Sequence, residues 1–408
     1  MNPFQGMFDR QKRHFATGVT RSRKWRVEQL DRMGRLLAEN EAVLQQAIGQ
    51  DFKTASQEQI FETLECLGEV AFQKSQLEEW MKPIEAPVPR VLAAMGHRGV
   101  VYRDPYGVAL IIGPFNGPLL LLLRPAISAL AAGNCCVLKL SMAVEATSSL
   151  LMELVPKYFE PEAVAAVAGH REETTELLKL PFDFIFFTGS TSTGKVVARA
   201  AAENLTPVVL ELGGQNPALV DQTANIKDSA KKIVWGAMAW GGQWCTSPGY
   251  AYVHGSIAEE FVAEAKAALT ELFGEDPKSN SDYSRVISAR EVTRYQTLDE
   301  AFGRIAATPN PLAAFIFSRE QKTIDRFIRE LSFGGGAVNQ VNIHLFIETM
   351  PFGGVGPAGM GRYYGKYGFD MLTHAKSMLI SPPDVAIDHL FPPYTSEKNA
   401  ARKQWFEY

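Results

Sequence analysis

The chain has 408 residues, enough for two or three domains of ordinary size. Hydrophobic residues make up 46% of it and charged residues 21%, which excludes an intrinsically disordered chain. The formal net charge is −4, so the chain lacks the basic excess of nucleic-acid-binding proteins. We therefore expect a folded protein without a nucleic-acid partner.

The cysteines indicate a reducing compartment. None belongs to a CxxC pair, and the histidines form no metal-ligand spacing with them, so we expect no metal site. A disulfide framework is unusual in so long a chain, which favours a cytoplasmic protein. Charged residues interrupt the first segment, so no signal peptide is expected, and prolines break the apolar run Val108–Leu123, so no membrane span is expected. The cysteines are Cys66, Cys135, Cys136 and Cys245.

The N-terminal part of the chain predicts helices. Between residues 20 and 82, apolar side chains recur three, four or seven positions apart, as at Leu30, Met33 and Leu37. Prolines then interrupt the pattern. Residues 90–106 predict a hairpin that leaves the core, with a strand near Val100.

Strands and helices alternate from there onward. Such alternation predicts an α/β fold with a doubly wound, mainly parallel sheet, followed by a second and smaller α/β unit that begins near Leu212. The strands of the first unit are expected at Val108–Ile112, Cys136–Leu140, Phe182–Thr188 and Val208–Leu212, and those of the second at Ala251–Val253 and residues 310–318.

The segment Phe186–Val196 leads from a strand into a helix. Gly189 lets the backbone approach a phosphate, and a helix N-terminus offers unpaired N–H groups and a positive dipole. Gly189, Gly194 and the next lysine have Walker A spacing, and the apolar run ending at Asp221 resembles a Walker B strand. Val196 replaces the Ser or Thr that holds magnesium, so a P-loop ATPase is disfavoured; an ordinary capped helix remains an alternative.

Three further residues are candidates for chemistry. Cys245 lies in a glycine-rich turn, where a thiolate nucleophile is accessible. Glu211 ends an apolar strand, where a buried carboxylate is paired or functional and a raised pKa suits a general base. Asn116 lies between a strand and a helix, where its amide can form a turn or donate to an oxyanion. A core thiol and an exposed strand end are the alternatives for the first two.

The segment Gly354–Gly359 has the formal pattern GxGxxG. No βαβ unit follows it, and Pro357 stiffens the loop. We therefore do not interpret it as a dinucleotide-binding fingerprint.

Taken in order, these motifs resemble the aldehyde dehydrogenase superfamily, most closely its short, class 3-type branch. The likeness runs from about residue 8 to about residue 382. It implies a cofactor-binding domain at residues 1–211, a catalytic domain at 212–338 and a C-terminal cofactor-site loop and oligomerisation arm at 339–408. The segments that carry it are Ile112–Asn116, Ala132–Asn134, Val137–Lys139, Phe187–Ser190, Leu210–Gly214, Gly242–Cys245 and Pro351–Gly356.

The resemblance implies oxidation of a small-molecule aldehyde to a carboxylic acid. Cys245 would attack the aldehyde, and Asn116 and the Cys245 backbone N–H would hold the thiohemiacetal oxyanion. Hydride transfer to the cofactor would leave a thioester, which water activated by Glu211 would hydrolyse. Residues 90–106 and the C-terminal segment would pair two subunits into a homodimer. NAD or NADP would be held by Lys139, Gly189, Ser190, Gly194, Phe115 and Phe352.

The chain departs from the family pattern at several positions. Leu140 and Met142 replace a Pro and a Glu, and because that Glu would contact the adenosine ribose, NADP becomes more plausible. Trp244 replaces a Thr beside the nucleophile and would crowd the acyl pocket. Phe115 replaces a Trp, which is a mild change.

The largest departure is a gap after Arg290. The family continues there for several dozen residues, including a Glu-Glu-Ile-Phe-Gly-Pro segment whose Glu would grip the nicotinamide ribose. Its loss would weaken cofactor orientation and leave a sheet edge exposed. Two alternatives follow: a cofactor-independent cysteine esterase or thioesterase using Cys245, Asn116 and Glu211, or a weak or inactive member acting as a partner subunit.

Overall fold

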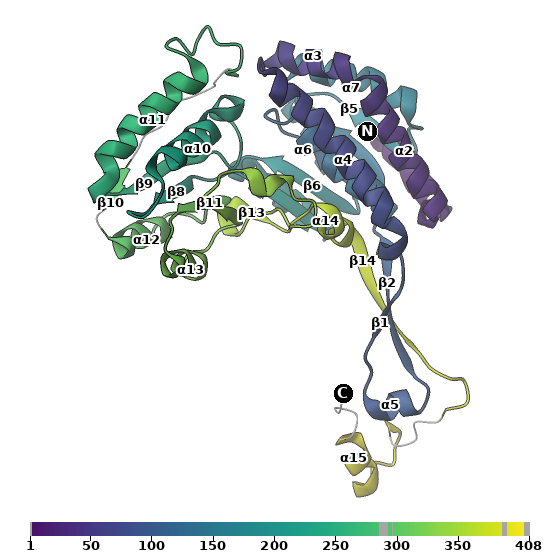
Figure 1. Ribbon diagram of the computed structural model, residues 1–408. Helices are drawn as coiled ribbons and strands as arrows, with labels where there is room; N and C mark the ends of the chain where they lie inside the picture. Colours follow the sequence, from purple (N-terminus) through teal and green to yellow (C-terminus); the bar gives the residue numbers. More distant parts are fainter. Residues whose placement is uncertain (1, 285–292, 296, 386–389, 404–408) are drawn as a thin grey trace.

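Three β-sheets organise the part of the chain that this computed structural model describes, namely residues 2–284, 293–295, 297–385 and 390–403. A six-stranded and a five-stranded sheet form the cores of two lobes, and a three-stranded sheet forms an arm that extends away from them (Figure 1). The predicted α/β fold class is confirmed.

The six-stranded sheet has the order β13-β7-β6-β3-β4-β5, and all its strands except β13 run parallel. From β3 the chain moves outward to β4 and β5 and then returns to β6 on the other side of β3. Loops diverge at such a switch point, where ligands bind in open α/β sheets. The strands are β3 (Val108–Ile112), β4 (Cys135–Lys139), β5 (Val164–Val167), β6 (Phe184–Gly189), β7 (Val208–Leu212) and β13 (Gly359–Met360).

Helices cover both faces of this sheet. Successive residues of a strand point to opposite faces, and in β3 both sets are apolar, so each face is buried under helices. Ala109 and Ile111 pack with the cluster under one group of helices, and Leu110 and Ile112 pack with the cluster under the other. The first group is α2 (Arg23–Glu39), α3 (Glu41–Asp51), α4 (Ser56–Trp80), α6 (Leu120–Ala132) and α7 (Glu145–Tyr158); the second is α1 (Gln5–Ala16), α8 (Arg171–Leu178) and α9 (Thr191–Ala202).

No described helix combines the length and the hydropathy needed to cross a bilayer.

The five-stranded sheet is entirely parallel and has the order β10-β9-β8-β11-β12. The chain enters it directly after β7, at β8. The gap predicted after Arg290 falls in residues 285–292, which lie outside the described residues. The elements are β8 (Asn216–Val220), β9 (Pro248–His254), β10 (Thr293–Tyr295), β11 (Ala313–Phe317), β12 (Gly335–Val338), α10 (Ile226–Met238), α11 (Ala258–Phe273), α12 (Leu298–Ala306) and α13 (Gln321–Glu330).

The arm corrects one prediction. Residues 90–106 do not form a hairpin by themselves; they contain helix α5 (Arg90–Ala94) and a single strand, β2 (Arg98–Pro105). Strand β2 pairs antiparallel with β1 (Ile84–Ala86) on one side and with β14 (Thr373–Ile380) on the other. The partner β14 comes from the far end of the chain, so the local pattern held no signal for it. Helices α14 (Gly365–Met371) and α15 (Ser396–Lys403) flank β14 in the sequence.

Asn134 joins three segments of the first lobe, so its loss should destabilise the fold. The side chain is fully buried; its Oδ1 accepts the Gly107 N–H at 2.9 Å, and its Nδ2 donates to the carbonyls of Leu372 at 2.9 Å and Ala129 at 3.3 Å. Asn134→Ala removes the side-chain partners of the Gly107 N–H and the Leu372 carbonyl, while the Ala129 carbonyl keeps its backbone donors, and we expect it to lower the free energy of unfolding by about 2–4 kcal/mol. Urea denaturation measures this; equal midpoints for Asn134→Ala and the exposed control Asn204→Ala would contradict it.

Candidate active site

Cys245 lies in the turn that connects α10 to β9. The chain passes through a short 3₁₀ helix, η2 (Ala239–Gly242), in which Trp240, Gly241 and Gly242 have left-handed backbone angles of φ 57°, 61° and 72°. Cys245 is half-buried, whereas the other cysteines are buried. It is therefore the thiol that a small molecule reaches most easily.

Glu211 lies on β7 with its carboxylate buried. Its side chain is 3% exposed, and neither oxygen accepts a hydrogen bond from the described part of the chain. This burial raises the pKa of Glu211 well above its ordinary value. Burial, and next the Glu211 charge, raise the pKa of Cys245 to about 12, while the backbone N–H groups of Cys245 and Thr246 lower it. The two groups are thus electrostatically coupled.

Asn116 lies in the loop between β3 and α6, at the switch point of the sheet. Its side chain is largely buried, and its Nδ2 donates to the carbonyl of Gln243 at 2.8 Å. An amide nitrogen carries two N–H groups, so one remains to donate to an oxyanion. The hydrogen bond joins the Asn116 loop to the Cys245 loop, two segments far apart in the sequence.

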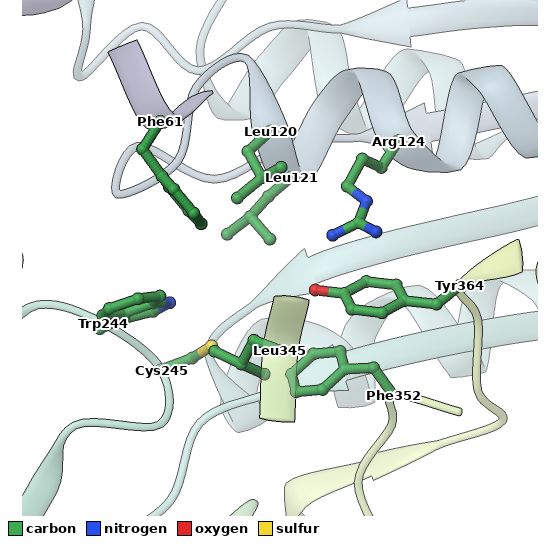
Figure 2. Close-up of a pocket in the computed structure, with 9 residues that line it drawn as sticks. All are labelled: Phe61, Leu120, Leu121, Arg124, Trp244, Cys245, Leu345, Phe352 and Tyr364. Atoms are coloured by element: carbon green, nitrogen blue, oxygen red, sulfur yellow. The ribbon is translucent and has the colours of Figure 1, made fainter. Parts of the chain in front are cut away.

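A narrow pocket opens beside the Cys245 sulfur (Figure 2). It holds about 10 Å³ of open space, which is room for about one water molecule. Trp244 forms one wall, with its ring stacked on Trp240 at 4.6 Å between centroids and 12° between planes. Apolar side chains fill most of the remainder. The other lining residues are Phe61, Leu120, Leu121, Arg124, Leu345, Phe352 and Tyr364.

Arg124 forms a polar end of this pocket that the sequence analysis missed. Its side chain is 1% exposed and pairs with Glu65 at 3.5 Å, Glu69 at 3.0 Å and Glu348. Its guanidinium carbon also lies 3.7 Å from the centroid of the Tyr364 ring. The signal was a charge inside an apolar helix, since an arginine so placed must find carboxylates once buried.

The start of α9 fits an anionic ligand. Ser190 caps the helix, and its Oγ accepts the Thr193 N–H at 3.3 Å. A Cβ on Gly189 would lie 2.6 Å from the Phe187 ring, and one on Gly194 would lie 2.7 Å from Leu212, so either Cβ would displace a neighbouring side chain. A helix N-terminus at the carboxyl edge of a parallel sheet is where dinucleotide phosphates bind in such folds.

Other residues predicted to hold a cofactor lie around the same edge. Lys139 ends β4, and its Nζ donates to the carbonyls of Leu140 at 2.7 Å and Gly169 at 2.5 Å, while burial lowers its pKa. Phe115 is half-buried in the Asn116 loop, and Phe352 lines the Cys245 pocket. The buried Thr188 hydroxyl at the end of β6 finds no partner among the described residues, as expected where a ligand completes the bonding.

The GxGxxG segment, Gly354–Gly359, contacts both β7 and the start of α9 at this edge of the sheet. Its last glycine begins β13 and pairs with Glu211 of β7, while the Thr191 hydroxyl at the start of α9 donates to the Pro357 carbonyl at 3.1 Å. A Cβ on Gly354 would lie 2.1 Å from the Ala358 carbonyl oxygen. The described residues contain no group of three or more His, Cys, Asp or Glu placed to hold a metal.

Comparisons with known proteins agree on one family. The profile described as aldehyde dehydrogenase family matches residues 9–298 and 290–378. The 4,4'-diaponeurosporen-aldehyde dehydrogenase of Staphylococcus aureus is 32% identical over 97% of this chain and 97% of its own. Human aldehyde dehydrogenase family 3 member B1 is 33% identical over 94% and 92%, and the dog enzyme named "Aldehyde dehydrogenase, dimeric NADP-preferring" is 32% identical over 96% and 98%.

Solved structures agree as well. The substrate-bound state of Staphylococcus aureus AldH covers 100% of both chains with a TM-score of 0.96 and 32% identity. An Escherichia coli NADP-dependent enzyme, 21% identical, covers 93% of this chain and 90% of its own with a TM-score of 0.82, which shows the shared fold. The alignment with the first sequence relative runs over 448 positions, more than the 408 residues of this chain, so that relative carries residues with no counterpart here.

The raised pKa of Cys245 predicts slow alkylation at neutral pH. Because the thiolate reacts and its pKa is about 12, we expect the rate of modification by iodoacetamide to rise about tenfold per pH unit from about pH 7 to about pH 10. Mass spectrometry of the Cys245 peptide measures it, with the buried Cys66, Cys135 and Cys136 as internal controls. A rate that levels off near pH 8 would contradict the raised pKa.

The buried Glu211 carboxylate predicts a stability that falls with pH. Its pKa in the folded protein lies above its ordinary value of 4.5, so the folded state holds the proton more tightly than the unfolded chain. The resulting stability is complete below that ordinary value and is lost as pH rises toward the folded pKa, by about 1.4 kcal/mol per pH unit. Glu211→Gln cannot ionise, so we expect a flatter pH dependence in urea denaturation between about pH 5 and about pH 8. Parallel curves for the two proteins would contradict this.

Proposed function

Because the chain belongs to the aldehyde dehydrogenase family, we propose that it oxidises an aldehyde to a carboxylic acid through a Cys245 thioester, with NAD or NADP as electron acceptor. The observation that carries the proposal is the convergence of three groups: a half-buried thiol, a carboxylate without a hydrogen-bond partner among the described residues, and an amide donor bonded to the thiol's own loop. This set fits acyl chemistry on a cysteine.

In the first half of the reaction the Cys245 thiol loses its proton to solvent water, and the thiolate sulfur attacks the aldehyde carbon. The carbonyl double bond becomes a single bond, and its oxygen takes the negative charge. Asn116 and the Cys245 backbone N–H donate to this oxyanion. Trp244 and Phe352 line the pocket in which the thiohemiacetal would form.

The residues at the carboxyl edge of the six-stranded sheet would hold the cofactor. Ser190 and the α9 N-terminus suit a pyrophosphate, Gly189 and Gly194 let the backbone approach, and Lys139 lies at the end of the neighbouring strand β4. A nicotinamide cofactor supplies a hydride acceptor when bound. Once a hydride had left the thiohemiacetal carbon for that acceptor, the acyl group would remain on Cys245 as a thioester.

Glu211 then serves as the general base. Its carboxylate takes a proton from water, the water oxygen attacks the thioester carbon, and the carbon–sulfur bond breaks to release the acid and the Cys245 thiolate. Burial raises the pKa of Glu211, which makes the ionised form a stronger base than an exposed carboxylate.

The sequence and the names of the relatives also support proposals for the preferred cofactor, the oligomeric state and the cellular compartment. Met142 stands where an NAD-favouring Glu would contact the ribose, and one relative is named NADP-preferring, so we propose NADP as the better cofactor. We also propose a homodimer, because the arm exposes Met378, Leu379 and Ile380 and the same relative is named dimeric. The four free cysteines favour the cytoplasm.

The proposal predicts aldehyde-dependent reduction of NAD or NADP that depends on Cys245. Purified protein is offered aliphatic and aromatic aldehydes with each cofactor, and absorbance of the reduced nicotinamide is followed. We expect Cys245→Ala to lower kcat/KM by at least about 10³-fold, because no other group forms the covalent bond. Retained reduction in Cys245→Ala would overturn the mechanism.

A folded protein that reduces neither cofactor would overturn the proposed oxidation and leave the alternatives suggested by its shorter length. Cleavage of activated esters by the wild type, with a covalent acyl adduct accumulating in Glu211→Gln, would identify the cofactor-independent esterase or thioesterase. Absence of both activities, with a dimer by light scattering, would identify a partner subunit.

A further inference from the structure

Three charged side chains on and just before α4, the helix that supplies Phe61 to the pocket, take no part in the proposed chemistry; two are fully buried and Glu58 is half-buried. Lys53, just before α4, and Glu62 on α4 are both fully buried and form an ion pair. Glu58 lies one helical turn before Glu62, so both carboxylates occupy one face of α4. Buried charges are costly unless paired and hydrogen-bonded, so their arrangement calls for a physical reason.

Glu62 contacts the loop that carries Asn116. Its Oε2 accepts the N–H groups of Leu119 at 2.8 Å and Leu120 at 3.0 Å, where that loop becomes helix α6. A carboxylate at this place satisfies N–H groups that lack partners within the helix and complements the helix dipole. The contact fixes the end of the loop next to Asn116.

Glu58 contacts the loop that carries Cys245. Its Oε1 accepts the Trp240 N–H at 2.7 Å, and its Oε2 accepts the Ser284 hydroxyl at 2.7 Å. Trp240 has a left-handed backbone angle of φ 57°, which is unfavourable for a residue with a large side chain. The hydrogen bond that the Trp240 N–H donates to Glu58 stabilises this turn in the conformation that leads the chain to Cys245.

Lys53 connects the two contacts. Besides pairing with Glu62, its Nζ lies 3.2 Å from the centroid of the Trp240 ring. Trp240 stacks on Trp244, which forms a wall of the pocket. One ammonium group therefore links the carboxylate under the Asn116 loop to the aromatic stack beside Cys245.

We propose that Lys53, Glu58 and Glu62 are positioning residues that set the separation between the Asn116 amide and the Cys245 thiol. The inference rests on the proposed function, because that separation matters when one oxyanion must meet both groups. The hydrogen bond from the Asn116 side chain to the Gln243 carbonyl joins the two loops directly. The cluster adds a rigid support, since each of its charges is held by a partner from another segment.

The first test is Glu62→Gln, with Glu78→Gln as the matched control on the exposed side of the same helix. We expect Glu62→Gln to lower kcat for aldehyde oxidation by about 10- to 100-fold, because small displacements of a reacting pair cost about that much. The dissociation constant of the cofactor, read by tryptophan fluorescence, stays unchanged. An unchanged kcat, or a loss that appears only as a raised cofactor KM, would overturn the proposal.

A double-mutant cycle separates positioning from a merely structural effect. In an Asn116→Ala background the oxyanion donor is already absent, so Glu62→Gln should lower kcat by less than about twofold. Equal losses in both backgrounds would show that the Glu62 contact acts without Asn116 and would overturn the proposal.

A second variant covers the case in which the unpaired Lys53 charge destabilises Glu62→Gln. The pair Lys53→Met with Glu62→Gln leaves no unpaired charge of that ion pair, so we expect it to restore the melting temperature while kcat stays low. Recovery of kcat together with the melting temperature would overturn the proposal.

A third measurement needs neither aldehyde nor cofactor. The rate of Cys245 alkylation by iodoacetamide reports the placement of the thiol even in a protein that reduces no cofactor. We expect Glu58→Gln to change it several-fold and Glu78→Gln to leave it unchanged. Absence of cofactor reduction by the wild type would overturn the proposed function, whereas an unchanged alkylation rate in Glu58→Gln would overturn the positioning inference.

Discussion

Burial of the Glu211 carboxylate is the constraint on which the arrangement of the site depends. A carboxylate without hydrogen-bond partners is costly inside a protein, and it lies here on β7 with β13 paired against its backbone. The buried hydroxyl of Tyr363 likewise finds no partner among the described residues, and after burial and Tyr364, the Glu211 charge helps raise its pKa. Such orphaned groups mark a place where water or a substrate completes the bonding.

Two other buried carboxylates, Glu62 and Glu69, differ from Glu211 in one respect. Glu62 pairs with Lys53, and Glu69 pairs with Arg124, so each of these carboxylates has a cationic partner and further donors. Paired charges hold their neighbours in place, whereas an unpaired carboxylate is free to change its protonation state. The molecule thus separates the groups that support the site from the group proposed to move a proton.

The sequence predicted what depends on local pattern and missed what depends on distant partners. Continuous apolar runs such as Val108–Ile112 identified buried parallel strands, because strands covered on both faces carry few polar residues. The sequence predicted that residues 90–106 form a hairpin by themselves. The prediction was wrong because the longest pairing of β2 is with β14, which lies far along the chain and leaves no local pattern. Arg124 and Lys53 were likewise missed, since their carboxylates lie on other elements.

The candidate site divides in the same way. The sequence singled out Cys245 in a turn, Glu211 at a strand end and Asn116 in a loop, and the resemblance joined them into one mechanism. In the structure, the Asn116 side chain bonds to the Cys245 loop, and the Glu211 charge helps raise the pKa of Cys245. Their catalytic roles stay predictions. The stack of Trp240 on Trp244 needed the structure, because left-handed backbone at a tryptophan has no sequence signature.

The shorter chain affects one half of the proposed chemistry more than the other. The pocket is lined by α4, α6, the Cys245 loop and the segment from Leu345 to Tyr364, whereas the two matches of the family profile meet at residues 290–298. Attack by the thiol and activation of water therefore rely on groups that the described chain supplies. The resemblance implies that a Glu in the missing segment would contact the nicotinamide ribose, so we expect its absence to act on the orientation of the proposed hydride acceptor. Holding the hydride acceptor in the right orientation lowers the entropic cost of the hydride step, and it does so independently of the nucleophile and the general base. A chain that lacks this contact can therefore retain acyl chemistry on its cysteine while its hydride step becomes slower.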